Sequence, residues 1–293
     1  MKQEVSSFWY TPKGYKGIGL MEFLSIKSFI DNGYKFILYT YNIDDKIFKK
    51  LDELFDDFEL RDANEIVSFR NYFKDNRGSG VAAFSDYFRF NLLYLRGGVW
   101  VDLDMICLNY IDLNQEYIFS QELDEEKNTS RITTSFLKFP KNSEFGKDLI
   151  MQAEKIINNQ KLIKWGIIGP NFLAKEVSKY NLENYFWDYK KTCQISWFEA
   201  NKFVLNNTHL DNSMFCLHLF SEMWRINHMK KDAIYFKGSI YSILIKKYNI
   251  EELTKQLNYK INFYNKYIYK YIFYIQNFIK TKNGKKGSNN AKV

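Results

Sequence analysis

The sequence predicts an α/β protein with a mainly parallel sheet, flanking helices and a helical, basic extension at its C-terminal end. Strand-like and helix-like segments alternate over the first half of the chain, which is the pattern of βαβ units. Hydrophobic residues make up 46% of the 293 residues and aromatic residues 18%, so we expect a sizeable packed core. The last part of the chain is enriched in lysine and poor in acidic residues, so the composition changes there.

The first four segments read strand, helix, strand, helix. The first helix has apolar residues at helical spacing, and Gly33 stands where that helix should end. The short links between segments favour parallel strands joined by helices. The four segments are Val5–Tyr10, Leu20–Gly33, Lys35–Tyr41 and Asp44–Phe55.

The order of elements is looser after Asp104. Two further strands are indicated by β-rich runs, and two further helices by apolar residues at helical spacing. Pro170 stands at a position suited to the first turn of a helix. The strands are expected at 117–122 and 131–139, and the helices at 144–159 and 169–180.

The net charge of +8 is located in one part of the chain. Residues 233–293 contain twelve Lys, no Arg, no Asp and two Glu, which gives +10 and leaves −2 for residues 1–232. We therefore expect a main domain over 1–232 and a basic, aromatic, helical extension over 233–293 with a disordered end from Thr281. Since the body is slightly acidic and the extension lacks Arg, no nucleic-acid partner is expected.

Cysteine usage and the apolar runs exclude several other classes. Three widely spaced cysteines without a CxxC pair argue against a disulfide framework or a zinc cluster and suit a reducing compartment. No apolar run follows the first lysine, so we expect no signal peptide, and no uninterrupted apolar stretch is long enough to span a bilayer. The absence of a Gly-rich Walker loop argues against an ATP-type phosphate cradle.

The stretch "FSDYFRFNLLYLRGGVWVDLDM", Phe84 to Met105, carries the candidate chemistry. On a helix, Asp86 and Arg89 lie one turn apart, away from the face that Phe84 and Phe88 share. Gly97-Gly98 should end this helix, because glycine accepts a positive φ at little cost. In the β-run that follows, Asp102 and Asp104 fall on the same side as Trp100, with backbones roughly 6.5–7 Å apart. Such a pair can hold a divalent cation, and ligands collect at the carboxyl ends of parallel strands.

Each candidate has an ordinary structural alternative. A DxD is common by chance, and an Asp–Arg pair at i, i+3 is often a weak surface ion pair. Trp9 can be a core aromatic residue, His218 a buried histidine with its hydrogen bonds satisfied, and Asn171 a helix cap. The register that joins helix, double glycine and β-run in one segment favours the functional interpretation.

The stretch "SDYFRFNLLYLRGGVWVDLDM" resembles the DxD-containing sugar-transfer region of family 32 of the glycosyltransferases and of related bacterial capsular polysaccharide synthesis proteins. It is also similar to the catalytic core of the large clostridial glucosylating toxins. The resemblance rests on Ser-Asp-x-x-Arg followed by Gly-Gly-x-x-x-Asp-x-Asp, with weaker similarity at "SFWY", "WGIIGPNFL" and "CLHLFSEMWR". It implies the Rossmann-like GT-A fold, a nucleotide-sugar donor, Mn²⁺ or Mg²⁺ as cofactor, and retention of the anomeric configuration.

The resemblance also implies roles for individual residues. Asp104 would be the main metal ligand, Asp102 a ligand directly or through water, and His218 a third ligand. Asp86 and Arg89 would bind donor-sugar hydroxyls, and Trp9 would stack on uracil. The expected catalytic residues are Asp86, Arg89, Asp102 and Asp104. The expected donor-binding residues are Trp9, Tyr41, Asp86, Arg89, Asp102, Asn171, Ser221 and Trp224.

The run Ile261–Lys282 has the features of a helix that lies in a membrane interface. On a helix its aromatic and aliphatic residues form one continuous edge, and Asn262, Lys266 and Lys270 mark a polar one. The alternative is a C-terminal helix packed on the core with its lysines in solvent. The apolar edge consists of Phe263, Tyr267, Tyr271, Ile275 and Phe278.

Together these features predict a metal-dependent, retaining glycosyltransferase that moves a hexose from a UDP-sugar to a bacterial surface glycan, such as capsule or lipooligosaccharide. The expected partners are the UDP-sugar, a glycan or lipid-linked saccharide acceptor, and an anionic membrane surface. The expected location is cytoplasmic, at the inner face of the membrane. The alternatives are an effector that glycosylates host protein, and a non-catalytic nucleotide-sugar-binding module that kept the fold.

Overall fold

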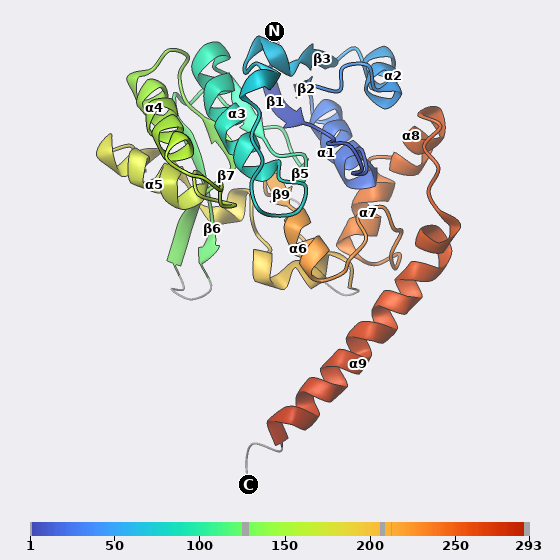
Figure 1. The fold of residues 1–293 in the computed structure, drawn as a ribbon. Coiled ribbons are helices and arrows are strands. Elements are labelled where there is room, and N and C mark those ends of the chain that lie inside the picture. The colour runs from blue at the N-terminus through green and yellow to red at the C-terminus, as the bar shows by residue number, and fades with distance from the viewer. Residues whose placement is uncertain (1, 125–128, 206–208, 212, 290–293) are drawn as a thin grey trace.

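The computed structural model describes residues 2–124, 129–205, 209–211 and 213–289, except for the side chains of 280–289. Its centre is a seven-stranded sheet with the order β3-β2-β1-β4-β7-β6-β8 (Figure 1). The strands from β3 to β4 run parallel, β7 is antiparallel to both of its neighbours, and β6 is parallel to β8. The predicted α/β class with a mainly parallel sheet is confirmed. The strands are β1 (Glu4–Trp9), β2 (Lys35–Thr40), β3 (Phe58–Asp62), β4 (Val99–Val101), β5 (Met105–Cys107), β6 (Ile118–Asp124), β7 (Thr129–Lys138), β8 (Phe186–Trp187) and β9 (Cys216–His218).

The predicted helices are present close to their expected bounds. Asp45 caps α2 by accepting a hydrogen bond of 2.8 Å from the backbone N–H of Ile47, and Pro170 opens α5 as predicted. The α-helices are α1 (Leu20–Asp31), α2 (Lys46–Leu54), α3 (Ala82–Arg96), α4 (Glu144–Asn158), α5 (Pro170–Lys179), α6 (Ser221–Ile226), α7 (Ile240–Lys247), α8 (Ile250–Gln256) and α9 (Tyr269–Asn289). Short 3₁₀ segments span Ala63–Glu65, Phe69–Asn71, Glu183–Tyr185, Tyr189–Lys191 and Trp197–Phe203, and a π-helical turn spans Tyr264–Ile268.

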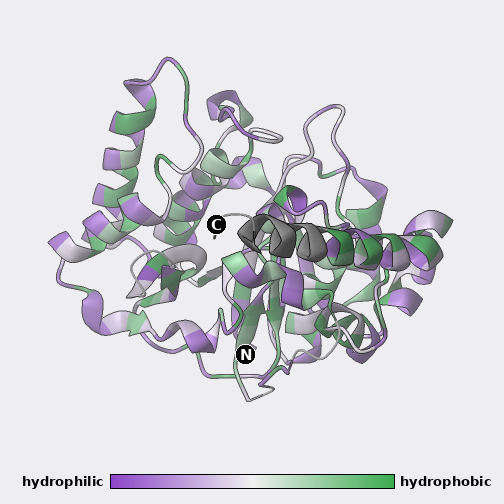
Figure 2. Ribbon diagram, turned by 90° about the horizontal axis from the view of Figure 1, so that it is seen from below, coloured by the Kyte–Doolittle hydropathy of each residue, from purple (hydrophilic) through white to green (hydrophobic). Residues whose placement is uncertain are grey.

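The sheet separates two hydrophobic cores, because side chains alternate along each strand. Val5, Leu38 and Val101 pack on one face with α1, and the residues between or beside them, such as Phe8 and Trp100, pack on the other face with α3. The flanking helices carry both hydrophilic and hydrophobic residues along their length, as amphipathic helices do (Figure 2). The result is a three-layer arrangement with the carboxyl ends of β1, β2 and β4 at one edge.

The double glycine behaves as predicted. Gly97 and Gly98 have φ values of +70° and +81°, and the backbone N–H of Gly97 donates to the carbonyl of Leu93 to close the last turn of α3. The chain therefore leaves α3 and enters β4 within two residues.

The run after Gly98 is not one continuous strand, and here the sequence-based expectation was wrong. β4 ends at Val101, and the N–H of Met105 donates to the carbonyl of Asp102 at 3.0 Å, which closes a turn over 102–105. β5 then pairs with β9 in a separate two-stranded sheet. Asp102 and Asp104 therefore lie in a turn at the edge of the main sheet and not along one strand face.

The C-terminal region contributes to the same core as the N-terminal helices. Tyr241, Leu244 and Leu253 are buried in the cluster that contains α1, and Asp232 accepts a hydrogen bond from the backbone N–H of Leu20. The division into 1–232 and 233–293 stays a prediction. Helix α9 extends away from the body (Figure 1), and residues 290–293 of the predicted disordered end lie outside the described part. No helix in that part combines the length and apolar character needed to cross a membrane.

Candidate active site

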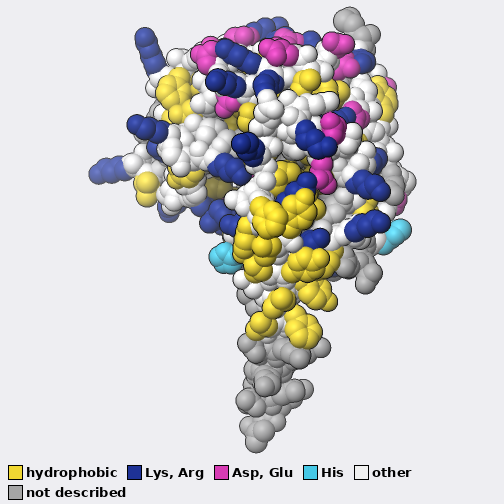
Figure 3. All heavy atoms as spheres, turned by 90° about the vertical axis from the view of Figure 1, so that its right-hand side faces the viewer, with side chains coloured by type: hydrophobic (Ala, Val, Ile, Leu, Met, Phe, Trp, Pro, Cys, Tyr) yellow, Lys and Arg dark blue, Asp and Glu magenta, His cyan; other side chains and the backbone are white. Residues whose placement is uncertain are grey.

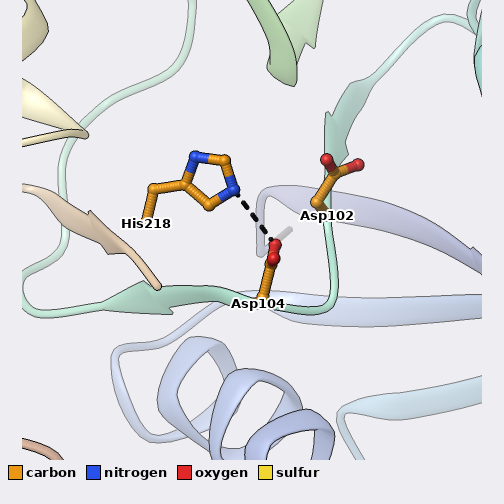
Figure 4. Close-up of side chains that lie close together, drawn as sticks. All are labelled: Asp102, Asp104 and His218. Atoms are coloured by element: carbon orange, nitrogen blue, oxygen red, sulfur yellow. Dashed lines mark ion pairs between the residues drawn. The ribbon is translucent and has the colours of Figure 1, made fainter. Parts of the chain in front are cut away.

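The structure brings the three predicted metal ligands together from distant parts of the chain. Asp102 directly follows β4 and Asp104 precedes β5, while the pairing of β5 with β9 sets His218 opposite Met105. One ligand atom from each of Asp102, Asp104 and His218 lies within 4.8 Å of the others. Figure 4 shows the His218 ring directed at the Asp104 carboxylate, with the Asp102 carboxylate beside them. This is the spacing that a single cation requires.

The two oxygens of the Asp104 carboxylate have different surroundings. Oδ2 accepts a hydrogen bond of 2.8 Å from the backbone N–H of Ser221, the first residue of α6. Oδ1 is buried, lies at an ion-pair distance of 3.3 Å from Nε2 of His218, and accepts no hydrogen bond within the described part of the chain. Burial alone would raise the pKa of Asp104, but the adjacent imidazole and the Ser221 donors lower that pKa below its usual range.

His218 is a buried ring with polar neighbours at both nitrogens. Nδ1 lies 3.9 Å from Sγ of Cys193, and the ring lies against Phe220 with 3.9 Å between centroids. Burial lowers the pKa of His218, yet the Asp104 carboxylate outweighs burial and holds that pKa well above its usual value. Without a metal the imidazolium therefore pairs with Asp104, and metal binding would have to displace this proton.

A buried chain of charges joins the helix motif to the turn. Nη1 of Arg89 lies 3.0 Å from Oδ1 of Asp102, and Nη2 lies 3.3 Å from Oδ1 of Asp86. The guanidinium also donates to the carbonyl of Thr134 at 2.5 Å and to the hydroxyl of Ser85 at 3.2 Å. The predicted surface-pair alternative for Asp86 and Arg89 is thus excluded, because both side chains are buried.

The two carboxylates beside Arg89 have raised pKa values. Burial raises the pKa of Asp86 to about 6, although Arg89 opposes the shift. Burial and the charge of Asp104 raise the pKa of Asp102, again against the effect of Arg89. The site therefore holds more negative charge than its cations neutralise, which is the condition in which a bound metal ion stabilises it.

Trp100 completes this arrangement. Its indole N–H donates to Oδ1 of Asp102 at 2.7 Å, and its ring lies under the Arg89 guanidinium at 4.7 Å. Its placement beside Asp102 in the alternating pattern was visible in the sequence, but its role was not identified there.

The Gly-Pro segment reaches the same place. A Cβ on Gly169 would stand 3.4 Å from Oδ2 of Asp86, so α5 begins directly against that carboxylate. Asn171, two residues on, is exposed on α5. Residues of the site that the sequence reasoning missed are Ser85, Trp100, Thr134 and Gly169, and the carbonyl of Thr134 could not have been found, since a backbone acceptor has no sequence pattern.

The other predicted donor-binding residues lie at differing distances from this centre. Trp9 is half-buried at the end of β1, its N–H bonded to the Thr11 hydroxyl at 2.8 Å and its ring 5.1 Å from the Lys231 ammonium. Tyr41 follows β2 and donates its hydroxyl to the carbonyl of Val67 at 2.6 Å. Ser221 adjoins Asp104, as described above.

Trp224 does not line the site as placed. Its ring is buried between Phe203 and Tyr241, and its indole N–H donates to the carbonyl of Leu219 at 2.8 Å. The contact of Trp224 with the donor, which the resemblance implies, therefore stays a prediction.

The side chains present fit a hard divalent cation. Two carboxylates and one imidazole form a donor set that Mn²⁺ and Mg²⁺ accept. Oδ1 of Asp104 is buried, accepts no hydrogen bond within the described residues and faces only the His218 ring, which is itself a proposed ligand. Cys193 is 3.9 Å from the His218 ring but on its far nitrogen, so no thiolate belongs to the donor set.

Comparison with known proteins identifies the central stretch. Residues 25–124 match the family described as glycosyltransferase sugar-binding region containing DXD motif. The match includes Asp86, Arg89, Asp102 and Asp104 and ends before His218. The resemblance to DxD-containing glycosyltransferases is thereby confirmed over this third of the chain, and glycosyltransferase activity is the reaction class that it supports. No curated protein matches the chain.

Solved structures with some likeness are also glycosyltransferases. The apo form of GlyE from Streptococcus pneumoniae TIGR4 aligns with a TM-score of 0.46 and 14% identity over 88% of this chain and 62% of that one. PaToxG glycosyltransferase aligns with a TM-score of 0.45 and 13% identity over 62% of this chain and 70% of that one. The catalytic domain of alpha-toxin from Clostridium novyi aligns with a TM-score of 0.35 and 12% identity over 85% of this chain and 73% of that one.

Proposed function

We propose that this protein is a metal-dependent, retaining glycosyltransferase of the family 32 type, which moves a hexose from a UDP-sugar to a bacterial surface glycan. The observation that carries the proposal is the meeting of Asp102, Asp104 and His218 within 4.8 Å, with the buried Oδ1 of Asp104 engaged by no hydrogen bond in the described part of the chain. The DXD-region match over residues 25–124 supports the same reaction class.

In this proposal Asp102, Asp104 and His218 hold Mn²⁺ or Mg²⁺. A hard cation at this place would act as a Lewis acid and offset the negative charge of a diphosphate leaving group. The Ser221 N–H fixes the rotamer of Asp104 through Oδ2, which leaves Oδ1 aimed at the shared space. The turn over 102–105 and the β5–β9 pairing keep the three ligands in place before any donor arrives.

Asp86 and Arg89 orient the donor sugar in this proposal. Arg89 cannot swing freely, because Thr134 and Ser85 accept its hydrogen bonds and the Trp100 ring lies beneath it. A rigid guanidinium beside a carboxylate offers both donors and an acceptor to vicinal hydroxyls. Trp9 at the end of β1 remains the proposed platform for the base, with Tyr41 and Asn171 as further proposed contacts.

Retention of configuration is part of the proposal. The three carboxylates of the site are already engaged in this proposal. Asp102 and Asp104 are metal ligands and Asp86 is paired with Arg89, so we assign none of them as a nucleophile that attacks the anomeric carbon. We therefore propose a front-face displacement in which the acceptor hydroxyl enters on the side that the leaving diphosphate vacates. An α-linked UDP-sugar should then give an α-linked product.

The proposed acceptor is a growing capsule or lipooligosaccharide chain, and the proposed location is the inner face of the cytoplasmic membrane. An effector that glycosylates host protein is distinguished by the acceptor, since it would label protein and not a lipid-linked saccharide. A non-catalytic binding module is distinguished by calorimetry, since it would bind UDP without turnover of any donor.

The first prediction tests the metal centre. Purified protein should hydrolyse or transfer from one member of a UDP-sugar panel with Mn²⁺ or Mg²⁺ present and should lose this activity in chelator. Asp104→Asn should reduce turnover by about 10²–10³-fold, since it removes charge at the proposed centre. Mass spectrometry identifies the donor, and the anomeric proton coupling in the NMR spectrum of the product reports its configuration.

The matched control for this substitution is Asp44→Asn, the same chemical change at an exposed carboxylate on the loop before α2. Turnover of this variant should equal that of the wild type. Undiminished activity in chelator would contradict the proposed metal centre, and a β-linked product would contradict retention.

A further inference from the structure

Helix α9 presents an apolar face whose side chains are largely exposed in the described part of the chain. Eight aromatic or aliphatic side chains of the π-helical turn and α9, together with Phe263 before them, are 39–67% exposed. Figure 3 shows hydrophobic side chains gathered along this side of the molecule. The opposite side of the helix is anchored, because Tyr269 and Phe273 are buried against Tyr235. The exposed residues, named here as the apolar face, are Phe263, Tyr264, Tyr267, Ile268, Tyr271, Tyr274, Ile275, Phe278 and Ile279.

A groove rich in lysine lies beside this face. It has a volume of about 660 Å³ and runs between α7 and the first turns of α9. No lysine that lines it forms an ion pair with a carboxylate of the described chain, and its one carboxylate, Glu251, is engaged by Lys266 at 3.0 Å. The lysines, named here with the groove as the lysine groove, are Lys237, Lys246, Lys247 and Lys270.

An unsatisfied hydroxyl lies in the same groove. Oγ of Ser242 on α7 is buried and has no hydrogen-bond partner among the residues that the structure describes. Leaving such a group unpaired costs about 1–3 kcal/mol, so a polar ligand at this place would stabilise it. Ammonium groups around a hydroxyl donor form a site suited to phosphate oxygens.

Charge decides which occupant the apolar face favours. Residues 233–293 carry twelve Lys and two Glu, so a second copy of the chain would bring like charges together. An anionic bilayer, by contrast, offers phosphates to the lysines and an apolar interior to the aromatic residues. Tyrosine is moreover suited to the boundary between headgroups and acyl chains, because it has an apolar ring and a polar tip.

We propose that the apolar face and the lysine groove together bind an anionic phospholipid bilayer, with a headgroup phosphate in the groove and the face of α9 in the interface. This deepens the membrane location in the proposed function and rests on it, but binding to vesicles is measured without any donor sugar. The apolar face and the lysine groove contain none of the proposed metal ligands or donor-binding residues, so the two activities can fail separately.

The test is co-flotation of the full chain with vesicles of phosphatidylcholine alone or with phosphatidylglycerol added. We expect binding only to the anionic vesicles, and release as salt is raised. Lys246→Glu/Lys270→Glu should weaken partitioning by about tenfold or more, because two contacts with the anionic surface become repulsive. Tyr271→Ser/Ile275→Ser should weaken it as well, through the lost apolar contact.

The matched control is Lys147→Glu/Lys175→Glu, which makes the same charge change at exposed lysines of α4 and α5, on the opposite flank from α9 (Figure 1). This variant should bind like the wild type. An equal loss in control and groove variants would overturn the groove, since binding would then depend only on total charge. Equal binding to neutral vesicles, or no binding together with dimerisation in sedimentation velocity that Tyr271→Ser/Ile275→Ser abolishes, would overturn the bilayer as occupant.

Two readouts keep these results interpretable. Thermal unfolding shows whether each variant is folded, and metal-dependent donor hydrolysis in solution should be unchanged in every variant of α7 and α9. Vesicle binding by a wild type that hydrolyses no donor would refute the proposed function and leave the membrane site standing.

Discussion

Arg89 is the residue on which the buried charges of the site depend. It lies between Asp86 and Asp102, at 3.3 Å and 3.0 Å, and its other donors are taken by Ser85 and Thr134. Burying these charges costs free energy, which the ion pairs and hydrogen bonds only offset in part. For Asp86 the cost of burial is larger than the gain from Arg89, because burial raises the pKa of Asp86 to about 6 despite the guanidinium. The ionised carboxylate of Asp86 therefore lowers the stability of the folded protein at neutral pH.

We predict that Asp86→Asn stabilises the metal-free protein at neutral pH while it removes donor hydrolysis. The folded-state pKa of about 6 lies above the usual value of 3.8, so the folded state binds more protons than the unfolded state between these pH values. Wild-type stability should therefore fall as pH rises through this window and stay lower above it. The asparagine variant should gain ~1–2 kcal/mol at pH 7–8, less than the full shift because it also loses the charge facing Arg89.

Denaturant unfolding over a range of pH checks this prediction. The gain should vanish near pH 4, where wild-type Asp86 is protonated. Asp44→Asn serves as the control, because Lys49 lowers the pKa of Asp44 and its loss should bring no gain at neutral pH. A difference between Asp86→Asn and wild type that does not vary with pH would show that the ionisation of Asp86 carries no cost.

At the scale of elements, local sequence patterns predicted the helices and strands but missed the turn over 102–105. The helix that carries Asp86 and the double glycine were predictable, since helical spacing and the tolerance of glycine for positive φ are local properties. The turn over 102–105 was not, because "VWVDLDM" alternates like a strand and only the pairing of β5 with β9, far along the chain, draws it out of the sheet. His218 depends on the same long-range pairing, so the sequence alone supported it only through the family resemblance.

The double glycine supplies the prediction at this scale. Gly97 has φ +70° and ψ −149°, a conformation that residues with a Cβ rarely adopt, and a Cβ there would stand 3.3 Å from Cβ of Lys141. Gly97→Ala should lower the free energy of unfolding by ~1–3 kcal/mol, measured by denaturant titration. Gly17→Ala is the control, since Gly17 has no positive φ and a Cβ there meets only the Thr11 hydroxyl at 4.0 Å. Equal stability of the two variants would show that α3 can end without glycine.

At the scale of the whole molecule, the C-terminal extension has two parts with different roles. Composition indicated the basic extension but could not say which residues pack, because burial depends on what the neighbouring elements offer. Of the two interpretations that the sequence left open, packing on the core holds for part of the extension, and membrane binding stays a proposal. Tyr259 packs on Phe23 and bonds to Asp232, and Tyr269 and Phe273 join the core, while the apolar face of α9 is exposed.

Two truncations separate these parts. Deleting 276–293 removes the outer portion of α9 and keeps Tyr269 and Phe273, so the protein should fold normally and hydrolyse donor, with weaker binding to anionic vesicles. Deleting 258–293 also removes the buried rings, and each buried aromatic side chain lost costs about 3–5 kcal/mol. The longer deletion should therefore lower the melting temperature sharply or prevent folding, which calorimetry and circular dichroism would show. Equal melting temperatures for the two truncations would mean that residues 258–275 add nothing to the stability of the core.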